Sequence, residues 1–158
     1  MSGDRLSVAL PFTVLGTGCV VVGGLVAAAT APVPSTHASW AAAYLVLVAG
    51  VAQVFLGLGE AVLAPHLPSR PQVVAQAGVW NAGNAAVLTG TLTGTVPLVD
   101  LGGALLVIGL VLLARTVRGG IRHGTGWERW SLYGFWLLVL VLLVSIPVGL
   151  LLARTGAS

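Results

Sequence analysis

Five long apolar stretches fill almost the whole chain, and they restrict it to a helical membrane protein. A helix that crosses a bilayer needs roughly 20 mainly apolar residues at about 1.5 Å per residue. The stretches that meet this length are separated by breaks rich in proline and glycine, and they cover residues 6–31, 39–64, 73–94, 98–117 and 130–153. The sequence therefore predicts an all-α fold: a polytopic membrane helical bundle of five transmembrane helices, forming one integral membrane domain over residues 1–158.

The composition leaves too few charged residues to cover a surface that faces water. Hydrophobic residues make up 57% of the chain and charged residues 7%, whereas soluble domains carry about 25% charged residues. No basic stripe with aromatic readers is present, so nucleic acid is not expected as a partner. We expect the lipid bilayer as the environment, with a second copy or another membrane protein as a further partner. The absence of lysine and the richness in Ala, Gly, Val and Leu indicate a bacterial genome and hence an inner membrane.

The arginines orient the predicted bundle. One arginine, Arg154, lies on one side of the spans, and six lie in the gaps on the other: Arg5, Arg70, Arg115, Arg118, Arg122 and Arg129. Because cytoplasmic loops carry the excess of basic residues, the N-terminus is predicted in the cytoplasm and the C-terminus outside the cell membrane. The first span is far longer than the 7–15 apolar residues of a signal peptide, so we expect it to be retained.

A cluster of these arginines follows the fourth span and precedes the fifth. Two interpretations fit it equally well: contact with anionic lipid headgroups, or the charge bias of cytoplasmic loops alone. Its members are Arg115, Arg118, Arg122 and Arg129.

Polar side chains follow one face of the second and third predicted helices. These candidates for a polar seam or ligand path are Gln53, Glu60, Gln76, Trp80, Asn81 and Asn84. The short loop between the two helices makes them antiparallel neighbours, and matching depth about it places Gln53 opposite Asn84, Gly57 opposite Trp80 and Glu60 near Gln76. Such residues either hold helices together, at about 0.6 kcal/mol per hydrogen bond, or line a path for an ion or solute.

Depth matching also predicts specific contacts in this seam. Gln53 and Asn84 fall near the middle of the bilayer, where an unpaired amide is costly, so a mutual hydrogen bond is expected. Gly57 should leave room for the Trp80 ring. Glu60 lies about one turn from the cytoplasmic end of its helix, where the helix dipole disfavours an anion. Its compensation is an ion pair with an arginine such as Arg70, Arg115 or Arg118, a captured cation, or a proton.

Small residues at helical spacing predict close packing of backbones. In the first helix they form a run that suits an internal contact or a dimer seam equally well, and two glycines of the second helix extend the set. The residues expected at these contacts are Gly16, Cys19, Gly23, Ala27, Gly50 and Gly57.

The sequence offers no catalytic residues, no metal ligand set and no cofactor motif. The favoured hypothesis is a non-enzymatic accessory or interaction subunit of a membrane assembly. The first alternative is an oligomeric transporter of an ion or small solute that uses the polar seam. Broken helices at the midplane are typical of many transporters, and none is evident in the sequence. The second alternative, a lipid- or quinone-linked membrane enzyme, lacks a catalytic set, so we lean against enzymatic activity without excluding it.

Overall fold

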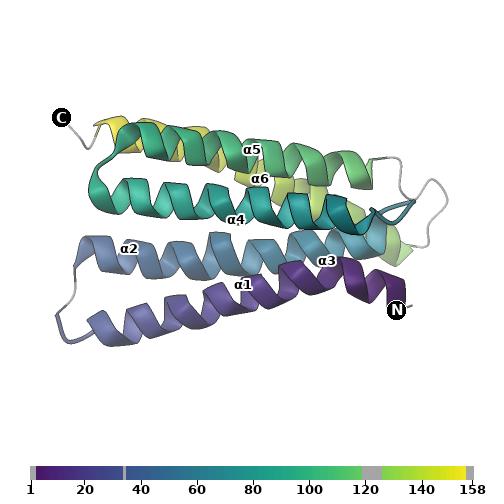
Figure 1. Cartoon of the computed structure of the whole chain (residues 1–158), viewed down its shortest axis with the longest axis horizontal. Helices are drawn as coiled ribbons and strands as arrows, with labels where there is room; N and C mark the ends of the chain where they lie inside the picture. The colour runs from purple at the N-terminus through teal and green to yellow at the C-terminus, as the bar shows by residue number, and fades with distance from the viewer. Residues whose placement is uncertain (1–2, 34, 119–125, 156–158) are drawn as a thin grey trace.

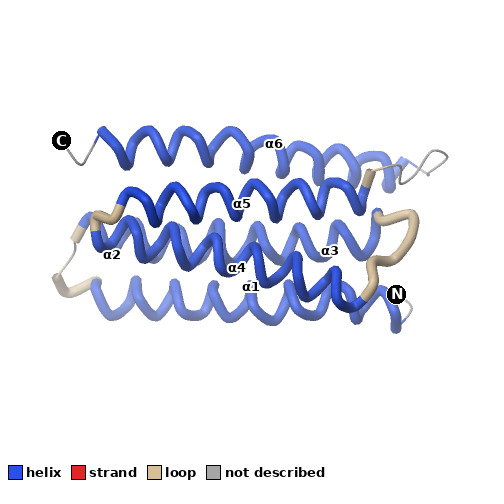
Figure 2. Tube along the Cα trace, turned by 45° about the horizontal axis from the view of Figure 1, so that its top comes forward, coloured by secondary structure: helices blue, strands red, loops and turns tan. Residues whose placement is uncertain are grey.

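The computed structural model describes residues 3–33, 35–118 and 126–155, and the elements in these ranges are all helical. The predicted all-α fold is therefore confirmed. In chain order the elements are α1 (Gly3–Thr30), α2 (Thr36–Tyr44), η1 (Leu45–Ala52), α3 (Gln53–Leu63), α4 (Arg70–Thr93), α5 (Val96–Val117) and α6 (Gly126–Thr155). Here α2, η1 and α3 follow one another without a break and form one long helix, which we call the second rod. With the second rod counted once, the described residues form five rods. They lie side by side along the long axis of the molecule, with the chain termini at opposite ends (Figures 1 and 2).

Within the described residues, four helices are long and apolar enough to cross a membrane. They are α1, the second rod over Thr36–Leu63, α5, and the part of α6 from Arg129 to Pro147. The protein is therefore a helical membrane protein by the length and composition of its helices. The third predicted span does form a helix of full length, α4, but polar side chains lower its hydropathy, and it is not among the four. Those polar residues are Gln72, Gln76, Asn81, Asn84, Thr89, Thr91 and Thr93.

Several helices begin about one turn earlier than the apolar stretches predicted, because polar caps lie outside those stretches. The hydroxyl of Ser35 accepts a hydrogen bond from the Ala38 amide at 3.1 Å and starts α2. At the start of α4, Ser69 and Gln72 form a reciprocal capping box. The helices therefore extend into the interfacial residues that the apolar pattern omitted.

The middle of the second rod is a π-helix rather than an α-helix. The eight residues of η1, Leu45–Ala52, have this wider winding, and the α-helix resumes at Gln53. The span is therefore continuous but not uniformly α-helical, which the sequence did not predict. A π-helical stretch is rare and most often found at functional sites, because its hydrogen-bond register differs by one residue from that of the flanking helix.

Two hairpins carry most of the packing. The first consists of α1 against the second rod, and the second consists of α4 against α5, with α6 lying along α5 and α3. Between α4 and α5 the contact is very close: a Cβ on Gly83 would lie 3.0 Å from the Leu106 backbone nitrogen, and one on Gly102 would lie 2.8 Å from the Gly83 carbonyl oxygen. Gly94, with φ of 68°, provides the left-handed turn that joins the two helices. The largest buried side chains of the core are Phe12, Leu56, Trp80, Leu110 and Leu113.

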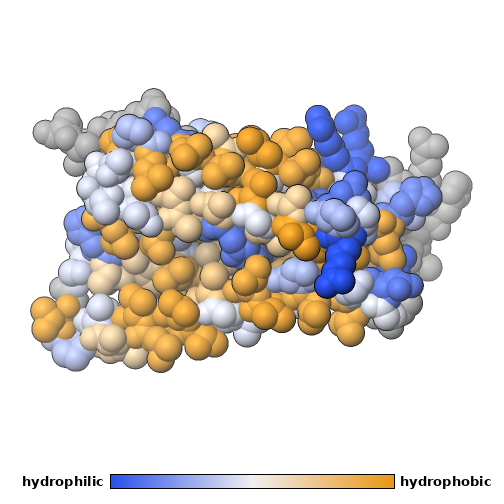
Figure 3. Space-filling model, viewed as in Figure 1, coloured by the Kyte–Doolittle hydropathy of each residue, from blue (hydrophilic) through white to orange (hydrophobic). Residues whose placement is uncertain are grey.

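The outer surface is mainly apolar, as Figure 3 shows along most of the length of the bundle. The most hydrophilic groups in that view gather near one end, where α1 begins and α3 ends. By their places in these elements Arg5, Arg70, Arg115 and Arg118 lie at this end, and Arg129 lies near the start of α6 there. We call it the arginine-rich end.

Candidate functional site

Glu60 lies at the centre of a buried hydrogen-bonded group that joins three helices. Its side chain is 0% exposed. Gln76 of α4 donates from Nε2 to Glu60 Oε1 at 2.8 Å, and from the same nitrogen to the Thr116 hydroxyl of α5 at 3.0 Å. Thr116 in turn donates to the Leu112 carbonyl at 3.1 Å. The prediction that Glu60 lies near Gln76 is thus confirmed, whereas Thr116 was not anticipated.

The carboxyl group of Glu60 is not compensated by an arginine. Within the described residues it forms no ion pair: Oε1 accepts the Gln76 hydrogen bond, and the buried Oε2 has no hydrogen-bond partner. The predicted ion pair with Arg70, Arg115 or Arg118 is therefore wrong. These arginines are exposed, whereas Glu60 points into the bundle.

Arg5 is the arginine that reaches the end of α3 near Glu60, and it binds backbone carbonyls rather than the carboxyl group. Its guanidinium donates from Nη1 to the carbonyls of Ala61 at 2.6 Å and Val62 at 3.0 Å. These are unpaired carbonyls at the C-terminal end of α3, where a cation is favourable. Arg5 therefore stabilises the helix end immediately after Glu60 without pairing with the carboxyl group.

Unpartnered polar atoms concentrate in the predicted polar seam. Both amide atoms of Gln53, Oε2 of Glu60, Oε1 of Gln76 and Nε1 of Trp80 are buried without a hydrogen-bond partner. All four residues belong to the predicted seam, and Gln53 and Glu60 are 0% exposed. Buried polar groups in native proteins are nearly always hydrogen-bonded, so a set of five such atoms on α3 and α4 calls for an explanation.

The predicted hydrogen bond between Gln53 and Asn84 is absent. Asn84 instead accepts from the Tyr44 hydroxyl at 2.9 Å and donates to the Trp80 carbonyl at 2.9 Å. Tyr44 is the last residue of α2, eight residues before η1 ends at Ala52. The prediction failed because it paired Asn84 with an amide side chain and did not consider the tyrosine hydroxyl. Asn81, the remaining seam residue, is half-buried and donates to the Ala77 carbonyl of its own helix at 2.8 Å.

Gly57 and Trp80, which were predicted to contact each other, pack against different helices. A Cβ on Gly57 would overlap Phe12 of α1, so the prediction that Gly57 accommodates Trp80 is wrong. The Trp80 ring lies instead against Gly109 of α5, 3.6 Å from the place of a Cβ there. The reason is that α4 packs mainly on α5, while the second rod packs mainly on α1.

The small residues of α1 fall into two groups. Gly16 and Gly23 are buried against the second rod: a Cβ on Gly16 would lie 2.8 Å from the Gly50 carbonyl oxygen, and one on Gly23 would lie 2.9 Å from the Ala42 carbonyl oxygen. Cys19 is half-buried with a free thiol, and Ala27 is exposed.

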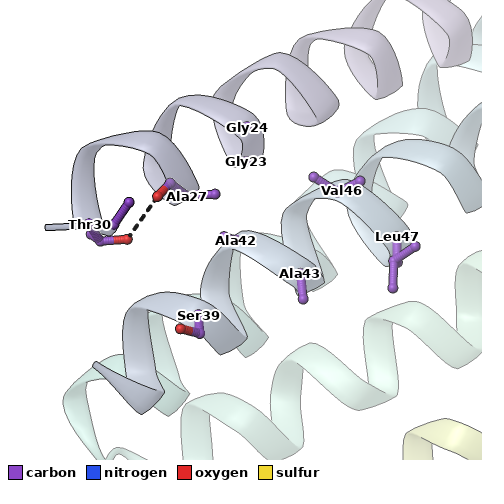
Figure 4. A pocket seen from close by; sticks show the side chains of 10 residues that line it. Gly23, Gly24, Ala27, Thr30, Ser39, Ala42, Ala43, Val46 and Leu47 are labelled. Atoms are coloured by element: carbon purple, nitrogen blue, oxygen red, sulfur yellow. Dashed lines mark hydrogen bonds between the residues drawn. The ribbon is translucent and has the colours of Figure 1, made fainter. Parts of the chain in front are cut away.

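An open groove of about 420 Å³ lies between α1 and the second rod, at the end away from the arginines. It is mainly apolar, and Figure 4 shows the residues of α1 and of the second rod that line it. The residues that line its two walls include Gly23, Gly24, Ala27, Ala42, Ala43 and Val46.

A second pocket, of about 380 Å³, lies at the arginine-rich end. Arg115, Thr116 and Arg118 at the end of α5 line one side, and His66 in the loop after α3 lines the other, with Gln72 from the first turn of α4. Thr116 thus lines this pocket while its hydroxyl accepts from Gln76. Of the other two arginines predicted to contact lipid, Arg129 is exposed on α6, and Arg122 lies outside the described residues.

Within the described residues, no group of three or more His, Cys, Asp or Glu side chains is placed to hold a metal ion. No family model, no curated protein and no solved structure matches the chain.

Proposed function

We propose that this membrane protein takes up and releases a proton at Glu60 and thereby takes part in ion transport. The observation that carries the proposal is the carboxyl group of Glu60, which is fully buried, has one oxygen unpartnered and pairs with no cation among the described residues. A charge buried in that way costs several kcal/mol, because neither water nor an opposite charge compensates it. A proton on Oε2 removes the charge, and ionisable residues within membrane helices commonly mark ion pathways.

Gln76 is suited to both protonation states of Glu60. When the carboxyl group is ionised, the Gln76 NH2 group donates to it, which is the observed arrangement at 2.8 Å. When Oε2 holds a proton, Oε1 is the carbonyl oxygen of the acid and still accepts from the Gln76 NH2 group, so this hydrogen bond is kept in both states.

The proposed route for the proton begins in the pocket at the arginine-rich end. Thr116 lines this pocket and is one hydrogen bond away from Gln76, which is one further hydrogen bond away from Glu60. The Thr116 hydroxyl donates to Leu112 and accepts from Gln76, and its second lone pair can accept from a water molecule in the pocket. The Gln76 nitrogen donates in both of its hydrogen bonds, so it does not relay a proton. A hydronium ion from the pocket therefore has to reach Oε2 itself, where it gives up its proton and leaves as water, and the reverse step returns the proton. Under the positive-inside rule this end faces the cytoplasm.

The charged groups near the route lie on its side toward the arginine-rich end. From α1, Arg5 contacts the backbone carbonyls of the two residues that follow Glu60. Beyond Thr116, the pocket adds Arg115, Arg118 and the imidazole of His66. From α6, the apolar side chain of Phe135 packs on Gly59.

Reconstituted vesicles test the proposal directly. An inward pH gradient is applied to proteoliposomes that contain a pH-sensitive dye, and the rate of proton entry is compared with that of protein-free vesicles. We expect Glu60→Gln, which keeps the shape but cannot exchange a proton, to reduce the protein-dependent rate to background. The matched control, Asp100→Asn, alters a carboxyl group of α5 and should keep the wild-type rate. Equal rates in wild type and Glu60→Gln would exclude proton exchange at this residue.

The groove between α1 and the second rod favours a second candidate function, an accessory or interaction subunit. An exposed run of small residues allows another transmembrane helix to approach closely. The partner is then a second copy or another membrane protein that inserts a helix between Gly24 and Ala43. Native mass spectrometry from lipid nanodiscs tests this function: Gly24→Leu should convert an assembly into monomers. A wild-type protein that is a partner-free monomer would contradict it.

A further inference from the structure

We propose that the pocket at the arginine-rich end binds a phosphate group. The pocket is formed by parts of the chain that lie far apart in sequence: the loop over residues 64–69, the first turn of α4 and the last turn of α5. Its polar lining offers donors from three segments, namely the guanidinium groups of Arg115 and Arg118, the imidazole of His66 and the amide NH2 group of Gln72, whereas the Thr116 hydroxyl, which also lines it, already donates to the Leu112 carbonyl. No carboxylate lines it.

The two arginines carry the recognition. Neither Arg115 nor Arg118 forms an ion pair or a side-chain hydrogen bond within the described residues, so both guanidinium groups are available to a ligand. The planar guanidinium presents parallel N–H groups that match two oxygens of a phosphate, and such charge-assisted pairs are stronger than neutral hydrogen bonds. Gln72 stands at the start of α4, where the helix dipole adds a partial positive charge.

The geometry favours a defined ligand over diffuse attraction of anions. The volume of about 380 Å³ lies within the range of small-ligand pockets, which starts at about 300 Å³. Two proline residues, Pro65 and Pro68, line the loop side, and proline fixes its own backbone angle and restricts the residue before it. Arg70 and Arg129 are exposed at the same end of the bundle but do not line the pocket. The charge bias of cytoplasmic loops explains all four arginines, but it does not explain why two of them line one open pocket together with His66.

The phosphate has two sources with the same chemistry, a lipid headgroup at the cytoplasmic surface or a free phosphate in solution. The pocket is also the start of the proposed proton route, but this inference does not rest on proton exchange, because the groups that would hold the phosphate do not include Glu60, Gln76 or Thr116. The Glu60→Gln variant should therefore keep the phosphate site while losing proton uptake, so the failure of one proposal is distinguishable from the failure of the other.

The test compares two double variants that remove the same number of charges from the same end. Full-length protein is purified as wild type, Arg115→Gln/Arg118→Gln and Arg70→Gln/Arg129→Gln, and circular dichroism verifies the helical content of each. In one arm, native mass spectrometry counts the phosphatidylglycerol molecules retained from nanodiscs that contain phosphatidylglycerol and phosphatidylcholine. In the other arm, inorganic phosphate is titrated in detergent and followed by phosphorus NMR line broadening. If the pocket double variant does not fold, the single variants Arg115→Gln and Arg118→Gln replace it.

We expect the pocket variant to weaken binding by at least about tenfold, whereas the control variant changes it by less than about twofold. Loss of retained phosphatidylglycerol in the pocket variant alone identifies a lipid headgroup as the ligand. Loss of phosphate binding with unchanged lipid retention identifies a soluble phosphate and supports the same site. Equal binding by the two double variants in both arms would overturn the proposal, since the arginines would then act only through their summed charge.

Discussion

The second rod makes two contacts of opposite character. Toward α1 it is dry and close: Gly16 meets the Gly50 carbonyl, and Phe12 fills the space beside Gly57. Toward α4 it is joined through long polar side chains, with Tyr44 hydrogen-bonded to Asn84 and Glu60 to Gln76. The five buried polar atoms without partners all lie on α3 and α4, and none lies on α1.

Under the proposed function, this difference assigns close packing and proton exchange to different faces of one helix. Close packing of backbones contributes dispersion energy and fixes the position of a helix, but it tolerates no added volume. Each unpartnered buried polar group costs about 1–3 kcal/mol. A seam that keeps several such groups is not optimised for stability, which is why we assign the activity to it.

The largest effect is expected on the dry side. Gly57→Ala places a methyl group on Phe12, whose Cγ would lie 2.7 Å away, so unfolding should become easier by about 1–3 kcal/mol. The control is Gly18→Ala on α1, where nothing lies within 4 Å and the change removes an unfavourable glycine from a helix. Thermal unfolding in detergent measures both. A Gly57→Ala protein as stable as the control would contradict the close contact with Phe12.

In the polar seam, loss of an unpartnered polar group should leave the protein as stable as before or make it more stable. Gln53→Leu replaces a buried amide that has no partner, so stability should be unchanged or higher by about 1 kcal/mol. Gln76→Leu, its control, removes a buried amide that donates to Glu60 and Thr116, and it should destabilise the protein. The comparison uses the same unfolding assay. If Gln53→Leu were the more damaging change, Gln53 would be a structural residue and the contrast between the two faces would fail.

The smallest effect on stability is expected at the end of the seam away from the arginines, where Tyr44 bonds to Asn84. Tyr44→Phe removes the hydroxyl that donates to Asn84, at a cost of about 0.6 kcal/mol, the average for such bonds in bilayers. Tyr133→Phe on α6, where the side chain is 66% exposed, serves as the control and should cost nothing measurable. Thermal unfolding of both proteins in the same detergent checks the difference. Equal midpoints would show that the Tyr44 bond adds nothing to the seam.

Helix number and type were predictable because apolar length and proline or glycine breaks are local properties of the sequence. The first residues of the helices were less predictable, because the N-cap residues Ser35 and Ser69 lie outside the apolar stretches and start the helices through hydrogen bonds of their hydroxyl groups. The π-helical segment was not visible at all. Leu45–Ala52 is a uniform apolar run that carries no local signal for the wider winding.

The depth of Glu60 and Gln76 followed from counting residues about one short loop, and their hydrogen bond bears this out. The contacts predicted wrongly were those that depended on which helices pack against each other. Counting assumed that consecutive helices pack on each other, but α4 packs mainly on α5, which places Trp80 against Gly109 and leaves Gly57 to Phe12. The spacing of Gly83 with Gly90 and of Gly102 with Gly109, seven residues each, was the available signal for that pairing.

The central claim is that Glu60 exchanges a proton inside the bundle, and infrared spectroscopy of the carboxyl group measures this directly. The protein in lipid films is titrated with buffers of rising pH, and the carbonyl band of the protonated carboxyl group is followed. We predict a band that loses intensity as the pH rises, that is absent in Glu60→Gln and that persists in Asp100→Asn. A spectrum in which Glu60→Gln removes no band, or in which that band does not change with pH, would contradict the account.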